Sequence, residues 1–130
     1  MASTPIREGF QTLVPYLSVR GAAGLIDFLR VVLGASETFR ASSGTHYEVR
    51  IGDSMLMIGE VGDRTPATAQ LFLYVEDADA VYARAIHAGA RSVIEPSDRP
   101  WGEGEDMIRG AGVTDPTGNT WYFAGGVRRS

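Results

Sequence analysis

The fold is decided by the stretch Leu71-Phe72-Leu73-Tyr74-Val75-Glu76-Asp77-Ala78, which repeats the pattern of Pro15-Tyr16-Leu17-Ser18-Val19-Arg20-Gly21-Ala22 earlier in the chain. In both stretches every second residue is apolar, as at Leu17 and Val19. Alternation with period two is typical of a β-strand that turns one face toward a core. Each stretch is therefore predicted to begin with a strand, and an internal repeat of this kind defines the architecture.

A helical pattern follows each of these strands. Apolar residues recur three and four positions apart, which is the spacing of one helix face. They are Ala22, Leu25, Phe28, Leu29, Val32 and Leu33 in the first copy, and Ala78, Val81, Tyr82, Ala85 and Ile86 in the second. Asp77 is a favourable N-cap for the second helix. Gly34 and Gly89 follow the two helices at matching places, where glycine favours helix termination.

Three short extended segments follow each helix. They are predicted at about 36–42, 45–51 and 54–60, and again at about 91–97, 107–113 and 119–124. Gly52-Asp53 and Asp115-Pro116-Thr117-Gly118-Asn119 are turn sequences between them. The sequence therefore predicts a single α+β domain of two βαβββ modules, at about 12–61 and 70–125, joined by a linker at 62–69. The alternative is an unrelated α+β sandwich whose symmetry is coincidental.

Composition limits the classes of function. A chain of 130 residues with 44% hydrophobic and 22% charged residues is typical of one globular domain. The net charge of −4 gives no electrostatic footprint for nucleic acid. No apolar run approaches the roughly 20 residues that a membrane span needs, and the N-terminal residues do not have the layout of a signal peptide. We therefore expect a cytoplasmic protein without a membrane or nucleic-acid partner.

Two residue types are missing from the chain. It has no cysteine, which excludes disulfides, thiolate catalysis and thiolate metal sites. It also has no lysine, which excludes Schiff-base chemistry. The histidines are His46 and His87, and His87 is predicted to lie on the exposed face of the second helix.

Four phrases of the sequence carry a family resemblance: Pro15–Val19, His46–Met57, Leu73–Val81 and Asp115–Trp121. They resemble a branch of the vicinal oxygen chelate superfamily, which contains glyoxalases, bleomycin-resistance proteins and extradiol dioxygenases. The resemblance covers roughly residues 12–125 and implies two curved mixed sheets, or half-barrels, around a cleft. It also implies a homodimer, because a second subunit often completes such clefts. One fold hosts many functions, so the resemblance alone does not define an activity.

Strand alternation predicts which side chains face the cleft. If Leu17 and Val19 pack under a helix, the residues between them face the other way. The predicted ligand-binding residues are Tyr16, Ser18, Gln70, Phe72, Tyr74, Trp101, Arg109 and Tyr122. Trp101, on a glycine-rich loop, is predicted either to stack on a ligand as a lid or to pack at the rim. An aromatic stripe that merely fills the inside of a small barrel is the structural alternative.

His46 and Glu48 are the catalytic candidates, because residues two apart on a strand point to the same side. His46 is suited to act as a general base, and Glu48 to orient it or to act as the acid. The alternative is a structural ion pair that also involves Arg50 or Arg109.

The resemblance also implies four metal-ligand positions, occupied in metal-dependent members by His, Glu or Gln. Here they fall near Val14, Gln70, Tyr122 and within Met55–Met57, and of these only Gln70 is a plausible ligand. We therefore predict no metal and no cofactor.

Three functions remain at this point. The first is a metal-free protein that binds a small, partly aromatic molecule, like the bleomycin-resistance proteins. The second is a lyase, isomerase or dioxygenase of the same superfamily that uses His46 and Glu48 with an atypical metal or none. The third is a regulatory module that has kept only the scaffold.

Overall fold

A computed structural model describes residues 6–100 and 106–128. The chain divides into two compact units, residues 1–67 and 68–130, which are called module one and module two below. In the described ranges no helix is both long and apolar enough to cross a membrane.

Module one has the predicted order of elements. It comprises β1 (Tyr16–Val19), α1 (Ala22–Leu33), β2 (Ser36–Arg40), β3 (His46–Ile51) and β4 (Ser54–Glu60). The strands form a four-stranded sheet in the order β1-β4-β3-β2. The first strand of the module therefore pairs with its last strand, in parallel, while β4, β3 and β2 are joined in antiparallel pairs.

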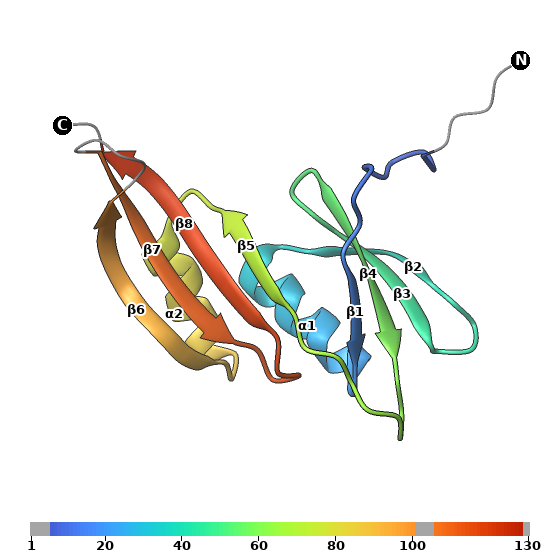
Figure 1. Cartoon of the computed structure of the whole chain (residues 1–130). Helices are drawn as coiled ribbons and strands as arrows, with labels where there is room; N and C mark the ends of the chain where they lie inside the picture. Colours follow the sequence, from blue (N-terminus) through green and yellow to red (C-terminus); the bar gives the residue numbers. More distant parts are fainter. Residues whose placement is uncertain (1–5, 101–105, 129–130) are drawn as a thin grey trace, which may run out of the picture. The chain divides into compact units, whose positions relative to one another are not determined.

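Module two repeats this topology. It comprises β5 (Gln70–Tyr74), α2 (Ala78–His87), β6 (Arg91–Pro100), β7 (Met107–Thr114) and β8 (Thr120–Arg128), and its sheet has the order β5-β8-β7-β6. The predicted α+β arrangement of two βαβββ modules is thus confirmed (Figure 1). Each sheet is open and does not close into a barrel. The strands β6 and β8 run a few residues beyond their predicted ends.

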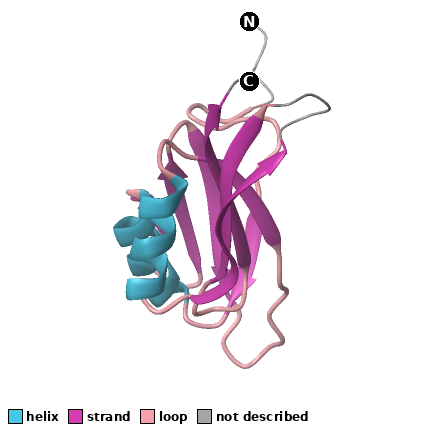
Figure 2. Ribbon diagram, turned by 90° about the vertical axis from the view of Figure 1, so that its left-hand side faces the viewer, coloured by secondary structure: helices cyan, strands magenta, loops and turns pink. Residues whose placement is uncertain are grey.

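The helix of each module covers one face of that module's own sheet, and the other face carries no helix of the module (Figure 2). Leu17, Val19 and Val49 are almost fully buried on the helix side of module one, and Trp121 and Phe123 on that of module two. These residues are the ones that strand alternation assigned to the core face, so the packing agrees with the predicted faces. The helix-free faces are the surfaces left for a site.

Glu60 caps α1 from the end of β4. The N-cap residue Gly21 has a left-handed backbone and offers no side chain. Glu60 Oε1 accepts hydrogen bonds from the amides of Ala22 and Gly21 at 2.9 and 3.0 Å. Backbone amides, those of Ala22 and Gly62 foremost, hold the pKa of Glu60 below its ordinary value. In α2 the predicted cap is confirmed, since Asp77 accepts from the amide of Ala80 at 3.0 Å.

The turn that begins at Asp115 locks the core of module two. Asp115 is 4% exposed, and its Oδ2 accepts a 2.6 Å hydrogen bond from Trp121 Nε1. Its Oδ1 accepts from the amides of Thr117 and Asn119 at 2.7 and 3.2 Å. Asn119 Oδ1 in turn accepts from the amide of Ala69 at 2.8 Å. The segment Asp115–Trp121, which contributes to the family resemblance, therefore stabilises the fold of module two.

Candidate functional site

The helix-free face of the module-one sheet gathers the candidate residues. Register pairs Phe39 with Glu48, Glu48 with Met57, and Met57 with Tyr16, so these residues form one row across the four strands. The neighbouring row contains His46, Gly59 and Ser18. Because paired residues in neighbouring strands share a face, the two rows define one surface.

A chain of polar contacts runs along this surface from Tyr16 to Glu48. The Tyr16 hydroxyl lies 3.4 Å from His46 Nδ1, and His46 Nε2 lies 3.0 Å from Glu48 Oε2. The rings of Tyr16 and His46 are stacked, with centroids 5.8 Å apart and planes at 28°. The ring of Phe39 lies on β2 with its centroid 6.2 Å from that of His46. The structure thus brings together Tyr16, His46 and Glu48.

Arg7 completes this chain and was not among the predicted site residues. Its Nη2 donates a short hydrogen bond to Glu48 Oε1, so that each carboxylate oxygen has a partner. Burial acts to raise the pKa of Glu48, which is 3% exposed, but hydrogen bonds from Arg7 and His46 outweigh it and lower the pKa. Glu48 is therefore an ionised carboxylate at neutral pH. The predicted alternatives, Arg50 and Arg109, are not its partners in the structure.

Residues 6–14, called the N-terminal cover below, lie over part of this surface. The side-chain amide of Gln11 binds the backbone of Met55 in both directions, donating to its carbonyl at 2.7 Å and accepting from its amide at 3.1 Å. Arg50 Nη2 donates to the carbonyl of Gly9 at 3.4 Å. The guanidinium of Arg7 lies over the ring of Phe10, 4.0 Å from its centroid.

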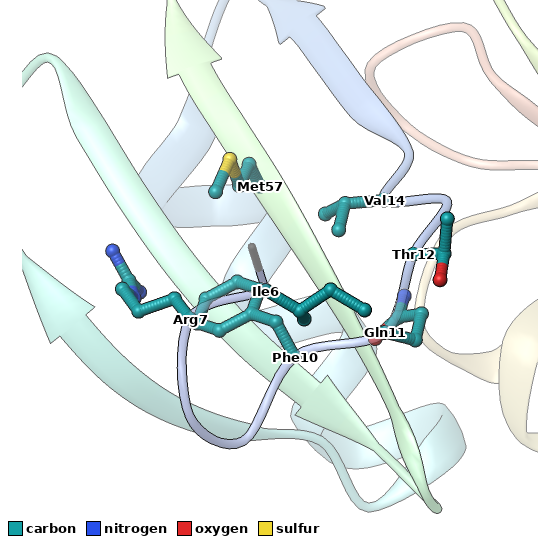
Figure 3. Close-up of a pocket in the computed structure, with 7 residues that line it drawn as sticks. All are labelled: Ile6, Arg7, Phe10, Gln11, Thr12, Val14 and Met57. Atoms are coloured by element: carbon teal, nitrogen blue, oxygen red, sulfur yellow. The ribbon is translucent and has the colours of Figure 1, made fainter. Parts of the chain in front are cut away.

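A cavity of about 230 Å³ lies between the cover and the sheet (Figure 3). Its lining is formed by Ile6, Arg7, Phe10, Gln11, Thr12, Val14 and Met57. Met57 belongs to β4, and the other lining residues belong to the cover (Figure 3). The lining therefore depends on the N-terminal cover and combines apolar side chains with a few polar groups.

The helix-free face of module two carries the other aromatic candidates. Phe72 and Tyr74 are 57% and 67% exposed, and their rings meet edge to face with centroids 5.2 Å apart. Tyr122 pairs with Phe72, and Gln70 lies two residues before Phe72 on β5. Gln70, Phe72, Tyr74 and Tyr122 therefore share one face, as the alternation predicted.

Arg109 lies away from this aromatic face. Its guanidinium binds both carboxylate oxygens of Asp79 on α2, at 2.9 and 3.1 Å, and Asp98 at 3.4 Å. The register of β7 is unbroken from Arg109 to Thr114, so alternation places Arg109 on the same face as the buried Ala111 and Val113, the face that α2 covers. The observed contacts give Arg109 a structural role in attaching α2 to the sheet. Trp101 lies outside the described residues.

The four positions implied for a metal can be tested against their chemistry. Val14 and Met57 both line the cavity of module one and offer hydrocarbon and a thioether. In module two, Gln70 and Tyr122 lie on the neighbouring strands β5 and β8 and offer a neutral amide and a phenol. Gln70 is thus the one plausible ligand among the four positions, and a divalent metal needs three or four, so these residues do not fit a glyoxalase-type metal. No group of three or more His, Asp and Glu residues forms elsewhere among the described residues.

Comparison with known proteins defines the family. The profile of the Glyoxalase/Bleomycin resistance protein/Dioxygenase superfamily matches residues 11–123, and the chain belongs to this superfamily. An uncharacterised protein of Mycobacterium bovis is 31% identical in an alignment of 134 positions that covers 89% of this chain and 84% of that protein.

Solved structures show the same fold. TioX from Micromonospora sp. ML1 superposes with a TM-score of 0.70 at 23% identity, over 92% of this chain and 99% of TioX. A glyoxalase/bleomycin resistance protein from Albidiferax ferrireducens T118 gives a TM-score of 0.70 at 20% identity, over 89% of this chain and all of that one, 100%. The predicted family resemblance is therefore confirmed.

Proposed function

We propose that this protein binds a small, partly aromatic molecule on the helix-free face of module one, without a glyoxalase-type metal. The observation that carries the proposal is the exposed ring of Tyr16, which is stacked on His46 beside the buried carboxylate of Glu48. Tyr16 is 54% exposed and Phe39 is 49% exposed. Exposed rings around a polar group favour a ligand that is itself flat and aromatic.

Charge and family support a binding role. The chain carries a net charge of −4, and the buried carboxylate of Glu48 lies on the proposed binding surface. The superfamily includes bleomycin-resistance proteins, and the description of the Albidiferax neighbour contains the same term. Binding of this kind needs the ring surfaces and one oriented polar group, and it does not need ligands at the four implied metal positions.

A second function is favoured by the pair of His46 and Glu48. An ionised, buried carboxylate bound to Nε2 fixes the tautomer and orientation of a histidine, as in enzymes that transfer protons. Nδ1 of His46 then faces the hydroxyl of Tyr16, at the exposed end of the chain of contacts. This arrangement suits a lyase or isomerase that moves a proton, more than it suits oxygen chemistry.

The experiment is a thermal-shift screen of aromatic compounds, with and without chelator, followed by calorimetry on His46→Ala. We expect metal-independent shifts for the wild type and loss of binding in the variant. Stability should fall by only about 1–3 kcal/mol, because Glu48 keeps Arg7 as a partner. His87→Ala, on the exposed face of α2, is the matched control and should change neither quantity.

Three results would contradict the proposal. Silence of the whole panel would favour the regulatory module, and shifts that disappear with chelator would point to a metal. Intact binding in His46→Ala would remove His46 from the site. Turnover of a bound compound that depends on His46 would instead support the second function.

Two further expectations remain proposals. Pairing into a homodimer follows from the family resemblance alone, and the mass in solution by light scattering measures it. Residence in the cytoplasm belongs to the same proposal, and cell fractionation tests it.

A further inference from the structure

We infer that Arg7 stands in for a positively charged group of the ligand, and that the N-terminal cover is a displaceable occupant of the module-one site. The inference rests on the proposed function and adds the chemical class of the ligand: an aromatic ring next to a guanidinium, amidinium or ammonium group. It also adds a form of self-inhibition.

The first argument is the asymmetry of the pair formed by Arg7 and Glu48. The side chain of Glu48 is 4% exposed, whereas that of Arg7 is 61% exposed. A buried carboxylate needs a charged partner, because an unpaired buried charge is strongly destabilising. Arg7, in contrast, reaches Glu48 from the surface, and its guanidinium is readily hydrated again when it leaves the carboxylate. The carboxylate is therefore the fixed half of the pair and the guanidinium the exchangeable half.

The second argument is the position of the ring beside that charge. The guanidinium of Arg7 lies over the ring of Phe10, 4.0 Å from the centroid, and both residues line the cavity. The cover therefore presents to the sheet a planar cation and an aromatic ring in contact (Figure 3). A small molecule with the same two groups would satisfy Glu48 and fill the space of Phe10 at once.

The third argument is the way in which the cover is held. Residues 6–14 form turns and bends and belong to no strand. Gln11 attaches the cover to the backbone of Met55 at 2.7 and 3.1 Å. Before Gln11, Arg7 is attached through its ion pair with Glu48, and Gly9 through a 3.4 Å contact from Arg50. Gly9 has a φ of +87°, where the chain turns back between Arg7 and Gln11. A ligand cation that replaces Arg7 on Glu48 therefore releases the cover at Arg7, while Gln11 keeps the cover attached to β4.

The consequence is a reduced apparent affinity. A ligand binds only the fraction of molecules in which Arg7 has left Glu48, so its measured affinity is lower by that fraction. Removal of the Arg7 guanidinium should raise the affinity for cationic aromatic molecules and leave neutral molecules of the same shape almost unaffected.

Phenylguanidine and phenylurea are suitable probes, because they have nearly the same shape and differ in charge. Titration calorimetry compares the wild type with Arg7→Met, which keeps much of the side-chain volume and removes the charge. We expect phenylguanidine to bind Arg7→Met at least about tenfold more tightly than it binds the wild type. Phenylurea should change by less than about twofold.

Arg50→Met is the matched control, because it removes one positive charge and one contact of the cover but leaves Arg7 on Glu48. It should gain far less affinity for phenylguanidine than Arg7→Met gains. In the double variant Arg7→Met/Glu48→Gln the gain should disappear, since the neutral amide no longer selects a cation.

The outcomes separate this inference from the proposed function. If both probes bind the wild type and Arg7→Met equally well, aromatic binding stands and the stand-in role of Arg7 is refuted. If neither probe binds any variant although compounds of the aromatic panel bind the wild type, this inference is refuted and the proposed function stands; if the panel is silent too, both are refuted. If Arg7→Met does not fold alone, circular dichroism with added probe decides: recovery with phenylguanidine but not phenylurea supports the inference, and recovery with neither refutes it.

Discussion

Gly59→Ala provides a test of the aromatic surface in which no site residue is itself substituted. Gly59 lies between Ser18 and His46 in the sheet. A Cβ at this position would lie 2.6 Å from the hydroxyl oxygen of Tyr16 and 2.9 Å from its Cε1. The obstructing atoms belong to the far end of a half-exposed side chain, so the ring of Tyr16 can swing into solvent. The substitution should therefore separate Tyr16 from His46 without disturbing the backbone.

The expected change in stability is small. Loss of the stacked Tyr16–His46 contact costs about 0.5–1.5 kcal/mol. Replacing a glycine inside a strand by alanine stabilises the fold by about 0.5–1 kcal/mol, because alanine has less conformational entropy in the unfolded chain. The free energy of unfolding should thus fall by about 1 kcal/mol or less. Affinity for an aromatic ligand should fall about fivefold, since one ring contact is worth about 1 kcal/mol.

Urea denaturation measures the first quantity, and calorimetry with an aromatic compound that binds the wild type measures the second. Gly112→Ala is the matched control in module two, where a Cβ would lie 2.9 Å from Cδ1 of Tyr122. It should displace Tyr122 and leave binding to module one unchanged. The reasoning is wrong if Gly59→Ala binds as well as the wild type, or if it loses more than about 3 kcal/mol, because the ring of Tyr16 would then be unable to move.

Three further substitutions test the contacts that stabilise the fold around the site. Asp115→Ala leaves the buried Trp121 Nε1 and two turn amides without an acceptor and should cost about 2–5 kcal/mol in urea denaturation, whereas an effect below about 1 kcal/mol would contradict the locking role. Glu60 has a lowered folded pKa, so its contribution should be complete above the ordinary value of 4.5 and should disappear as the pH falls through the folded pKa. Unfolding midpoints followed from neutral to acid pH should lose this component in Glu60→Gln, and an unchanged profile would argue against the cap. Gly125→Ala would place a Cβ 1.9 Å from the carbonyl oxygen of Val75, a backbone atom that cannot rotate away. The soluble yield and the melting temperature should therefore fall sharply. Wild-type values would show that the backbone at Val75 can move away from β8.

The inward and outward faces of the strands and the N-cap of α2 were predictable, because each depends on residues close together in the sequence. Period-two alternation placed Leu17 in the core and Tyr16 on the other side, and burial confirms both placements. The cap at Asp77 needed only the side chain and the amide three residues later. Ile26, which is also buried in α1, was missed because the apolar face of this helix is wider than the pattern assumed.

Other parts of the site depend on contacts that leave no local pattern. Arg7 and Glu48 are 41 residues apart, and nothing in the N-terminal residues predicts their pairing. The available signal was a weak one, the apolar residues Ile6 and Phe10 in the otherwise polar stretch of residues 6–12. The position of Arg109, in contrast, follows from plain alternation with the buried Ala111 and Val113 on β7.

The parallel pairing of β1 with β4 has a consequence for the order in which the protein assembles. Tyr16 hydrogen-bonds into a strand that contains Met57, so β1 is without its neighbour until nearly all of module one has left the ribosome. Contacts between residues so distant in sequence are slow to form, because a long loop must close first. The row that holds Tyr16, Met57 and Glu48 exists only after this closure. The binding surface should therefore be among the last parts of module one to appear during synthesis, and a chain that ends before β4 should show no trace of it.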